Sequence, residues 1–258
     1  MTPTSHRLLG LAAVVAATAL ALPTSTAVAS PSPDKGTASF PQTTGKHPRT
    51  EIMWNNVVPL KNQSQILVDE WGYRYMSGQQ DSHLTITYTD NGDLLFTDTG
   101  TESWRRLPNT CTKQKVSDGI EALCTIPAAF ADAHTMFVEV WPRLGNDWVD
   151  GSSLPAKFRL WVLADKGRDT VYGGAGDDFA NGYKGVDKFY GGPGDEWFRG
   201  GLDEDILQGD AGNDYLVSTD QDDDLDGGPG ADGLYCGNGH DTAYADSSDL
   251  VRFCEVLR

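Results

Sequence analysis

The sequence predicts an all-β protein in which a flattened β-solenoid of nine-residue units follows a β-rich N-terminal domain. Two observations lead to this prediction. A Gly- and Asp-rich unit recurs every nine residues from Ala164 to Tyr244 without an insertion, and a fixed short period is the signature of a repeat architecture. Upstream of it, short runs alternate apolar and polar residues, which is typical of half-buried strands.

The N-terminus has the features of an export signal. Arg7 precedes an unbroken stretch of small and apolar residues from Leu8 to Leu22, and Ala27-Val28-Ala29 follows before Ser30. This order of charge, apolar core and A-x-A site is typical of a secretory signal peptide. We therefore expect a signal peptide over residues 1–29, cleavage near Ala29/Ser30 and a secreted, extracellular protein. The apolar core is too short for a membrane span, and no later stretch is long enough, so we expect no membrane insertion.

Two further segments precede the repeats. Residues 30–50 are rich in Ser, Thr, Pro and Gly, and such a composition predicts a disordered leader. Residues 51–160 are expected to form the β-rich domain, because the alternating run from His83 to Thr97 surrounds the turn sequence Asp90-Asn-Gly-Asp93, which predicts a hairpin. Further β-like runs occur at 65–69, 136–141 and 158–163.

The chain is strongly acidic, with a formal net charge of -17. Residues 164–244 carry 19 Asp or Glu against five Lys or Arg. This balance disfavours nucleic acid and anionic membranes, which are polyanions, and favours cations. The sequence names no protein partner, and we expect a monomer.

Three positions of the nine-residue unit are nearly invariant along the array. The fourth is Gly in seven of nine units. The eighth is apolar in all nine: Val171, Ala180, Phe189, Phe198, Leu207, Leu216, Leu225, Leu234 and Ala243. The sixth is acidic in all nine: Asp169, Asp178, Asp187, Glu196, Asp205, Asp214, Asp223, Asp232 and Asp241.

These positions predict a site for cations. Six residues of each unit suffice for a tight turn and three for a short strand, so two units make one coil. In this geometry the eighth residue of each unit points inward. Glycines permit the turns, whose carbonyl oxygens become exposed. Equivalent carboxylates two units apart then stack, and the all-oxygen gap between them suits Ca²⁺. The nine acidic residues are the predicted ligands, in two columns that bracket up to about seven ions.

Units such as GGPGADGLY and GGAGDDFAN resemble the RTX, or haemolysin-type calcium-binding, nonapeptide G-G-x-G-x-D-x-U-x. The resemblance implies a parallel β-roll, a right-handed solenoid with Ca²⁺ between its turns, over residues 161–258. It assigns the ligand role to the nine sixth-position acids. The segment from Cys236 to Glu255 also resembles the ending of secreted bacterial members, in which a disulfide ties the last turn to a terminal cap.

Several residues depart from the repeat pattern. Glu196 is one methylene longer than Asp, so the gaps beside it are expected to bind weakly or to shift. Gly is replaced at the fourth position by Asp203 and Gln221, and at the second by Tyr183 and Thr219. Residues 143–149 look like a degenerate unit ahead of the array, with Asp147 as a weaker candidate ligand.

The four cysteines, Cys111, Cys124, Cys236 and Cys254, allow three disulfide connectivities. Proximity favours Cys111 with Cys124 and Cys236 with Cys254, because each pair closes a short local loop. The spacings of 13 and 18 residues contain no C-x-x-C and so do not favour zinc.

Other functions were weighed against calcium binding. Asp222-x-Asp224-x-Asp226-Gly227 has the opening spacing of an EF-hand, but Gly233 stands where the bidentate Glu belongs. Neither H-E-x-x-H nor G-x-S-x-G occurs, so we expect no catalysis. A secreted hydrolase with an unrecognised site in the N-terminal domain and an extracellular adhesion or matrix protein remain alternatives.

Overall fold

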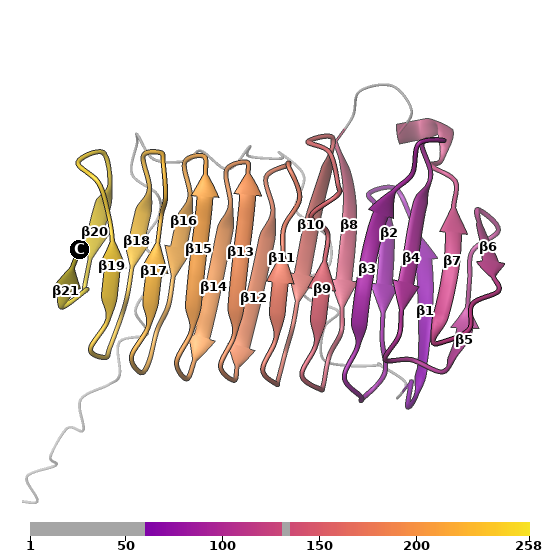
Figure 1. Cartoon of the computed structure of the whole chain (residues 1–258), viewed down its shortest axis with the longest axis horizontal. Helices are drawn as coiled ribbons and strands as arrows, with labels where there is room; N and C mark the ends of the chain where they lie inside the picture. The colour runs from indigo at the N-terminus through magenta and orange to yellow at the C-terminus, as the bar shows by residue number, and fades with distance from the viewer. Residues whose placement is uncertain (1–59, 131–134) are drawn as a thin grey trace, which may run out of the picture. The chain divides into compact units, whose positions relative to one another are not determined.

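A computed structural model describes residues 60–130 and 135–258. These residues form two β-sheets and one short 3-10 helix, η1 (Ala128–Phe130) (Figure 1). The all-β class and the β-rich N-terminal region are thereby confirmed. The predicted signal peptide, the leader and residues 51–59 lie outside the described residues. Within the described part, no helix is long and apolar enough to span a membrane.

One sheet has ten strands and the other has eleven. In spatial order, the ten-stranded sheet contains β20 (Leu250–Arg252), β18 (Gly233–Tyr235), β16 (Tyr215–Val217), β14 (Trp197–Leu202), β12 (Phe179–Lys184), β10 (Phe158–Leu163), β8 (Met136–Trp141), β2 (Gly72–Met76), β1 (Gln63–Val68) and β5 (Ser103–Arg106). The eleven-stranded sheet contains β21 (Val256–Leu257), β19 (Thr242–Tyr244), β17 (Asp224–Asp226), β15 (Ile206–Ala211), β13 (Lys188–Pro193), β11 (Thr170–Tyr172), β9 (Trp148–Asp150), β3 (His83–Tyr88), β4 (Leu94–Asp98), β7 (Ile120–Cys124) and β6 (Cys111–Gln114).

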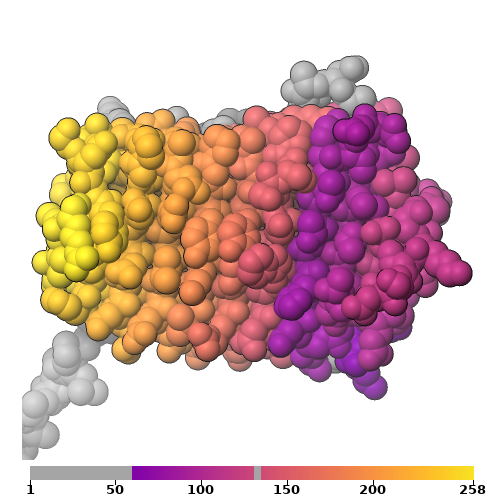
Figure 2. Space-filling model, viewed as in Figure 1, coloured from indigo at the N-terminus to yellow at the C-terminus, as the bar shows by residue number. Residues whose placement is uncertain are grey.

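The repeats fold as a parallel β-solenoid, as predicted. The chain alternates between the two sheets, and each strand pairs in parallel with the strand one coil later. Phe189 pairs with Leu207, Leu207 with Leu225, and Leu225 with Ala243, in constant register. In the space-filling view, the coils follow one another in chain order toward the yellow C-terminal end (Figure 2).

The core of the solenoid is a row of eighth-position side chains. All nine lie inside, with no more than 2% of each residue exposed. A fixed inward position is expected because side chains alternate between the two faces of a strand. Each fully buried large apolar side chain contributes about 1.5 to 3 kcal/mol.

Both sheets continue across the predicted domain boundary at 160/161. Strand β8 pairs in parallel with β2 and with β10, while β9 pairs in parallel with β3 and with β11. The predicted hairpin is confirmed, because β3 and β4 pair antiparallel around a turn in which Thr89 N–H donates to the Asp93 carbonyl. Antiparallel pairs of β4 with β7 and of β7 with β6 extend the eleven-stranded sheet.

Both predicted disulfides are formed. The bond between Cys111 and Cys124 joins β6 to β7. The bond between Cys236 and Cys254 joins the segment after β18 to the segment after β20. The second bond therefore ties the end of the chain to the last full coil of the repeat array.

Turns of successive coils pack backbone on backbone. A Cβ added at Gly185, where φ is +120°, would lie 1.4 Å from the Gly167 carbonyl oxygen of the preceding coil. Among the residues that replace a glycine of the repeat, Tyr183, Asp203 and Gln221 still take positive φ values of 72°, 81° and 80°, whereas Thr219 does not take a positive φ. The stacking of coils therefore imposes the turn conformation even on residues that disfavour it.

We predict that Gly185→Ala destabilises the folded protein more than Gly92→Ala. Both glycines have positive φ, but the atom nearest to a Cβ at Gly92 is 3.4 Å away, in ordinary contact. Backbone strain alone costs about 1 to 3 kcal/mol at either site, and only Gly185 adds a clash with a packed backbone. Urea unfolding of the two variants under identical conditions measures the difference. Equal losses in the two variants would contradict the close stacking.

Candidate metal site

All nine sixth-position acids are buried at the ends of turns. None has more than 2% of its surface exposed. The first column, which precedes strands of the eleven-stranded sheet, consists of Asp169, Asp187, Asp205, Asp223 and Asp241. The second column, which precedes strands of the ten-stranded sheet, consists of Asp178, Glu196, Asp214 and Asp232.

One carboxylate oxygen of each aspartate links two coils. In the first column, the backbone N–H of Asp169 donates to Asp187 Oδ1 at 2.8 Å, and that of Asp187 donates to Asp205 Oδ1 at 2.9 Å. The same bond joins Asp205 to Asp223 and Asp223 to Asp241. The second column repeats it from Glu196 to Asp214 and from Asp214 to Asp232, at 2.8 Å each. Hydrogen bonds to a carboxylate are stronger than neutral ones, so these bonds hold each column in register.

The other carboxylate oxygen is buried without a hydrogen-bond partner among the described residues. Both carboxylate oxygens of Glu196 are in this state. So are the Oδ2 atoms of seven aspartates: Asp169, Asp187, Asp205, Asp214, Asp223, Asp232 and Asp241. Leaving a buried polar group unsatisfied costs about 1 to 3 kcal/mol, and more for a charged one. A row of such oxygens fits a bound cation.

Glycine at the first position of the unit leaves room for that oxygen. A Cβ at Gly182 would lie 2.0 Å from Asp187 Oδ2 and 2.6 Å from the Gly200 carbonyl oxygen. A Cβ at Gly200 would likewise lie 2.2 Å from Asp205 Oδ2. Carboxylate and carbonyl oxygens therefore converge over the turns at Gly182 and Gly200. Ala164, Ser218 and Cys236 hold the first position of the three units that lack this glycine.

The donor set is made of oxygen atoms. The described residues contain no group of three or more His, Cys, Asp or Glu side chains around one point. A cation in a gap would take its carboxylate ligands from neighbouring coils and its other ligands from turn carbonyls. Hard oxygen ligands in a flexible arrangement suit Ca²⁺ better than Mg²⁺, which requires a small regular octahedron.

Two members of the second column differ from the rest. Asp178 has both oxygens occupied, because Oδ1 accepts the Leu160 N–H at 2.7 Å and Oδ2 accepts the Gly174 N–H at 2.6 Å. Glu196, with its longer side chain, has neither oxygen hydrogen-bonded among the described residues. The gap between these two acids therefore has a different hydrogen-bonding arrangement from the other gaps.

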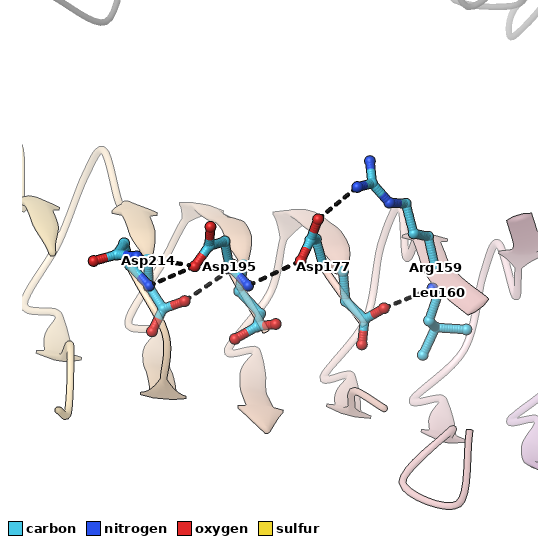
Figure 3. A network of polar contacts seen from close by, with 8 residues as sticks. Arg159, Leu160, Asp177, Asp195 and Asp214 are labelled. Carbon is cyan, nitrogen blue, oxygen red and sulfur yellow. Dashed lines mark hydrogen bonds and ion pairs between the residues drawn. The ribbon is translucent and has the colours of Figure 1, made fainter. Parts of the chain in front are cut away.

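A second polar ladder runs beside the second column at the fifth position of the unit (Figure 3). Arg159 pairs with Asp177, the Asp195 N–H donates to Asp177 Oδ1 at 3.3 Å, and the Asn213 N–H donates to Asp195 Oδ1 at 2.8 Å. Here the later coil donates to the earlier one, opposite to the sixth-position bonds. The second-column turns at Asp195 and Asn213 are thus tied to their neighbours by two sets of side chains.

Burial shifts the pKa of the column carboxyls upward. Desolvation raises the pKa of Asp187 and Asp205 to about 8, and the neighbouring carboxylate of the same column adds to the effect. The same causes raise the pKa of Glu196 to about 11. Desolvation, with the nearby charge of Asp249, raises the pKa of Asp232 to about 6. A cation in the gaps would offset this repulsion.

Three further acids extend the row of sixth-position hydrogen bonds. The fixed nine-residue period did not predict these acids as ligands. Asp147 accepts the Ser82 N–H at 2.6 Å, and its own N–H donates to Asp169 Oδ1 at 2.7 Å. At the other end, Asp249 accepts from Asp232 and Glu255 accepts from Asp241, both at 3.0 Å. Their separations from the adjacent acid are 22, 17 and 14 residues instead of 18, so the repeat count misses them. Asp147 alone had a sequence signal, in the degenerate unit at 143–149.

Together, the solenoid and its buried carboxylate columns define a repeat protein with oxygen-lined gaps between its turns. Comparison of the chain with models of known families identifies the type of repeat. The model of the RTX calcium-binding nonapeptide repeat matches four times, over residues 163–196, 190–225, 199–234 and 208–243. Residues 163–243 are therefore an RTX repeat array, as the sequence predicted, and repeats of this family bind calcium. No curated protein and no solved structure matches the chain significantly.

We predict that the calcium-free protein is more stable at pH 5 than at pH 8. An acid whose pKa is raised on folding holds its proton more tightly when folded. The resulting stability is complete below the ordinary value of 3.8 and is lost as the pH rises through the folded values of about 6 to 8. Thermal unfolding of dialysed protein, followed by circular dichroism, should show the melting temperature falling from pH 5 to pH 8. A rise over that interval would contradict the buried carboxyl columns.

Proposed function

We propose that this protein is a secreted calcium-binding protein whose β-roll holds Ca²⁺ between successive turns, without catalysis. The observation that supports this most directly is the row of buried carboxylate oxygens that lack a hydrogen-bond partner among the described residues. The nine sixth-position acids are the proposed ligands, and up to about seven gaps separate them. Export follows from the proposed signal peptide at residues 1–29, and we propose that the mature protein is a monomer.

The proposed gaps are not equivalent. Asp169, Asp187, Asp205 and Asp223 each offer a free Oδ2 to the gap that follows. Asp178 would have to give up its bond from the Gly174 N–H to do the same. We therefore propose that the gap between Asp178 and Glu196 binds calcium more weakly than the gaps of the first column.

Calcium binding should also govern folding of the repeats. Each unit buries about one apolar side chain, worth about 1.5 to 3 kcal/mol, whereas ordering each backbone residue costs about 1 to 2 kcal/mol. Stacked carboxylates oppose compaction further. An ion that binds only the folded state stabilises it by RT ln(1 + [Ca²⁺]/Kd), which is about 2.7 kcal/mol per ion at 100 times Kd. An array of such ions could offset the deficit.

Asp223→Asn should reduce the number of bound calcium ions by up to two, because Asp223 borders two gaps. The neighbouring Asp224→Asn is the matched control: it removes the same charge from an exposed side chain that points away from the gaps. The asparagine at 223 can still accept the Asp205 N–H through Oδ1. Isothermal titration calorimetry measures the stoichiometry. Equal counts in the wild type and both variants would refute the ligand assignment.

Calcium should raise the melting temperature of the whole protein more than an equal concentration of magnesium does. The reason is that gaps lined by carbonyl and carboxylate oxygens adapt to six to eight ligands, whereas Mg²⁺ keeps several of its waters. Differential scanning calorimetry at neutral pH and constant ionic strength separates ion binding from screening. Equal shifts with the two ions would show that charge neutralisation alone, and no selective site, stabilises the roll.

A further inference from the structure

The turn at residues 142–150 has the conformation of a repeat unit, although it lies before residues 163–243, which match the repeat family. Arg143, at the second position, has φ +83°, and Gly145, at the fourth, has φ +137°. Val149, at the eighth, is 1% exposed and pairs with Val171 of the first repeat unit. Asp147 occupies the sixth position of this unit.

Asp147 has the same bonding pattern as the aspartates of the first column. Its Oδ1 accepts a backbone N–H from the preceding coil, that of Ser82, and its own N–H donates to Asp169 Oδ1. The residue is 2% exposed, and its Oδ2, like that of Asp169, is buried with no hydrogen-bond partner among the described residues. Two unsatisfied carboxylate oxygens therefore border one more gap.

The backbone around this gap is stacked as tightly as within the array. A Cβ at Gly167 would lie 1.5 Å from the Gly145 carbonyl oxygen, close to the 1.4 Å between a Cβ at Gly185 and the Gly167 carbonyl. Leu144 and Lys166 form a parallel bridge, and Lys166 forms the next one with Lys184. The insertion that lengthens the spacing to 22 residues therefore leaves the turn itself unchanged.

The charges around Asp147 favour a cation. The charged groups that most strongly raise the pKa of the Asp147 carboxyl are those of Asp169, Asp81 and Asp98, and all three are acidic. Arg143 is the cationic residue of this turn, and the charged partner that acts on it is Asp165 rather than Asp147. Asp98 is itself satisfied by donors that include Ser82 Oγ and the His83 N–H.

We propose that the gap between Asp147 and Asp169 is an additional calcium site, placed before the recognised repeats. This inference rests on the proposed calcium binding of the array and extends the first column by one gap. Its ligands include Oδ2 of Asp147 and of Asp169. Because Asp147 is bonded to Ser82 at the start of β3, an ion here joins the antiparallel N-terminal strands to the calcium-bound roll.

The test compares Asp147→Asn with Asp150→Asn in the full-length protein. Asp150 is three residues further on, and its carboxylate accepts hydrogen bonds from Ser152 that an asparagine can also accept. Equilibrium dialysis with radioactive calcium should show one ion fewer in Asp147→Asn and an unchanged count in Asp150→Asn. An unchanged count in a folded Asp147→Asn variant would overturn the additional site.

Failure of this site can be told apart from failure of the array. If Asp147→Asn keeps the wild-type count while Asp223→Asn loses ions, the array binds calcium and the additional site is wrong. If the wild type binds no calcium, the proposed function itself is wrong. Should Asp147→Asn not fold, anomalous diffraction from wild-type crystals soaked in terbium decides the question. A peak between Asp147 and Asp169 supports the site, and peaks in the array without one there overturn it.

Discussion

The rest of the structure depends on one carboxylate per turn, whose two oxygens have different surroundings. Oδ1 of each first-column aspartate bonds to the backbone of the neighbouring coil, as in the 2.8 Å bond from Asp205 to Asp223. Oδ2 stays buried and unsatisfied by the described residues. The hydrogen bond holds the carboxylate against the neighbouring coil, and the second oxygen has no hydrogen-bond partner among the described residues. Cations between the turns would stabilise a solenoid held in this way, because burying unpaired charge is costly.

The sequence predicted the repeat region well because its period never changes between Ala164 and Tyr244. Each coil is stacked between two coils with the same repeat pattern, so a residue at a given position has the same surroundings in each coil. That is why Leu225 could be placed in the core, and Asp223 in a turn, from position alone. Tyr183, Thr219, Asp203 and Gln221 were the doubtful turn residues. All but Thr219 keep positive φ, because neighbouring coils hold them there.

The ends of the ladder could not be predicted by counting. Asp249 and Glu255 join the two columns across separations of 17 and 14 residues, so neither falls at a sixth position. In the N-terminal region, the hairpin of β3 and β4 was predicted from its turn, but the parallel pairing of β3 with β9 was not. That pairing joins residues more than 60 positions apart through backbone hydrogen bonds, and backbone bonds leave no pattern in the side chains.

The acids at the two ends show why the columns stop where they do. Ser82 stands where the next sixth-position acid before Asp147 would lie, and its hydroxyl donates to Asp98, so that coil contributes no unsatisfied oxygen. At the other end, Asp249 accepts from Asp232 through Oδ1 and from the Asp246 N–H through Oδ2. Both of its oxygens are occupied, and the disulfide between Cys236 and Cys254 secures the segment that supplies it. A terminal carboxylate that satisfies itself locally completes the last inter-coil bond without requiring another cation, which lets a repeating structure end without an unpaired charge.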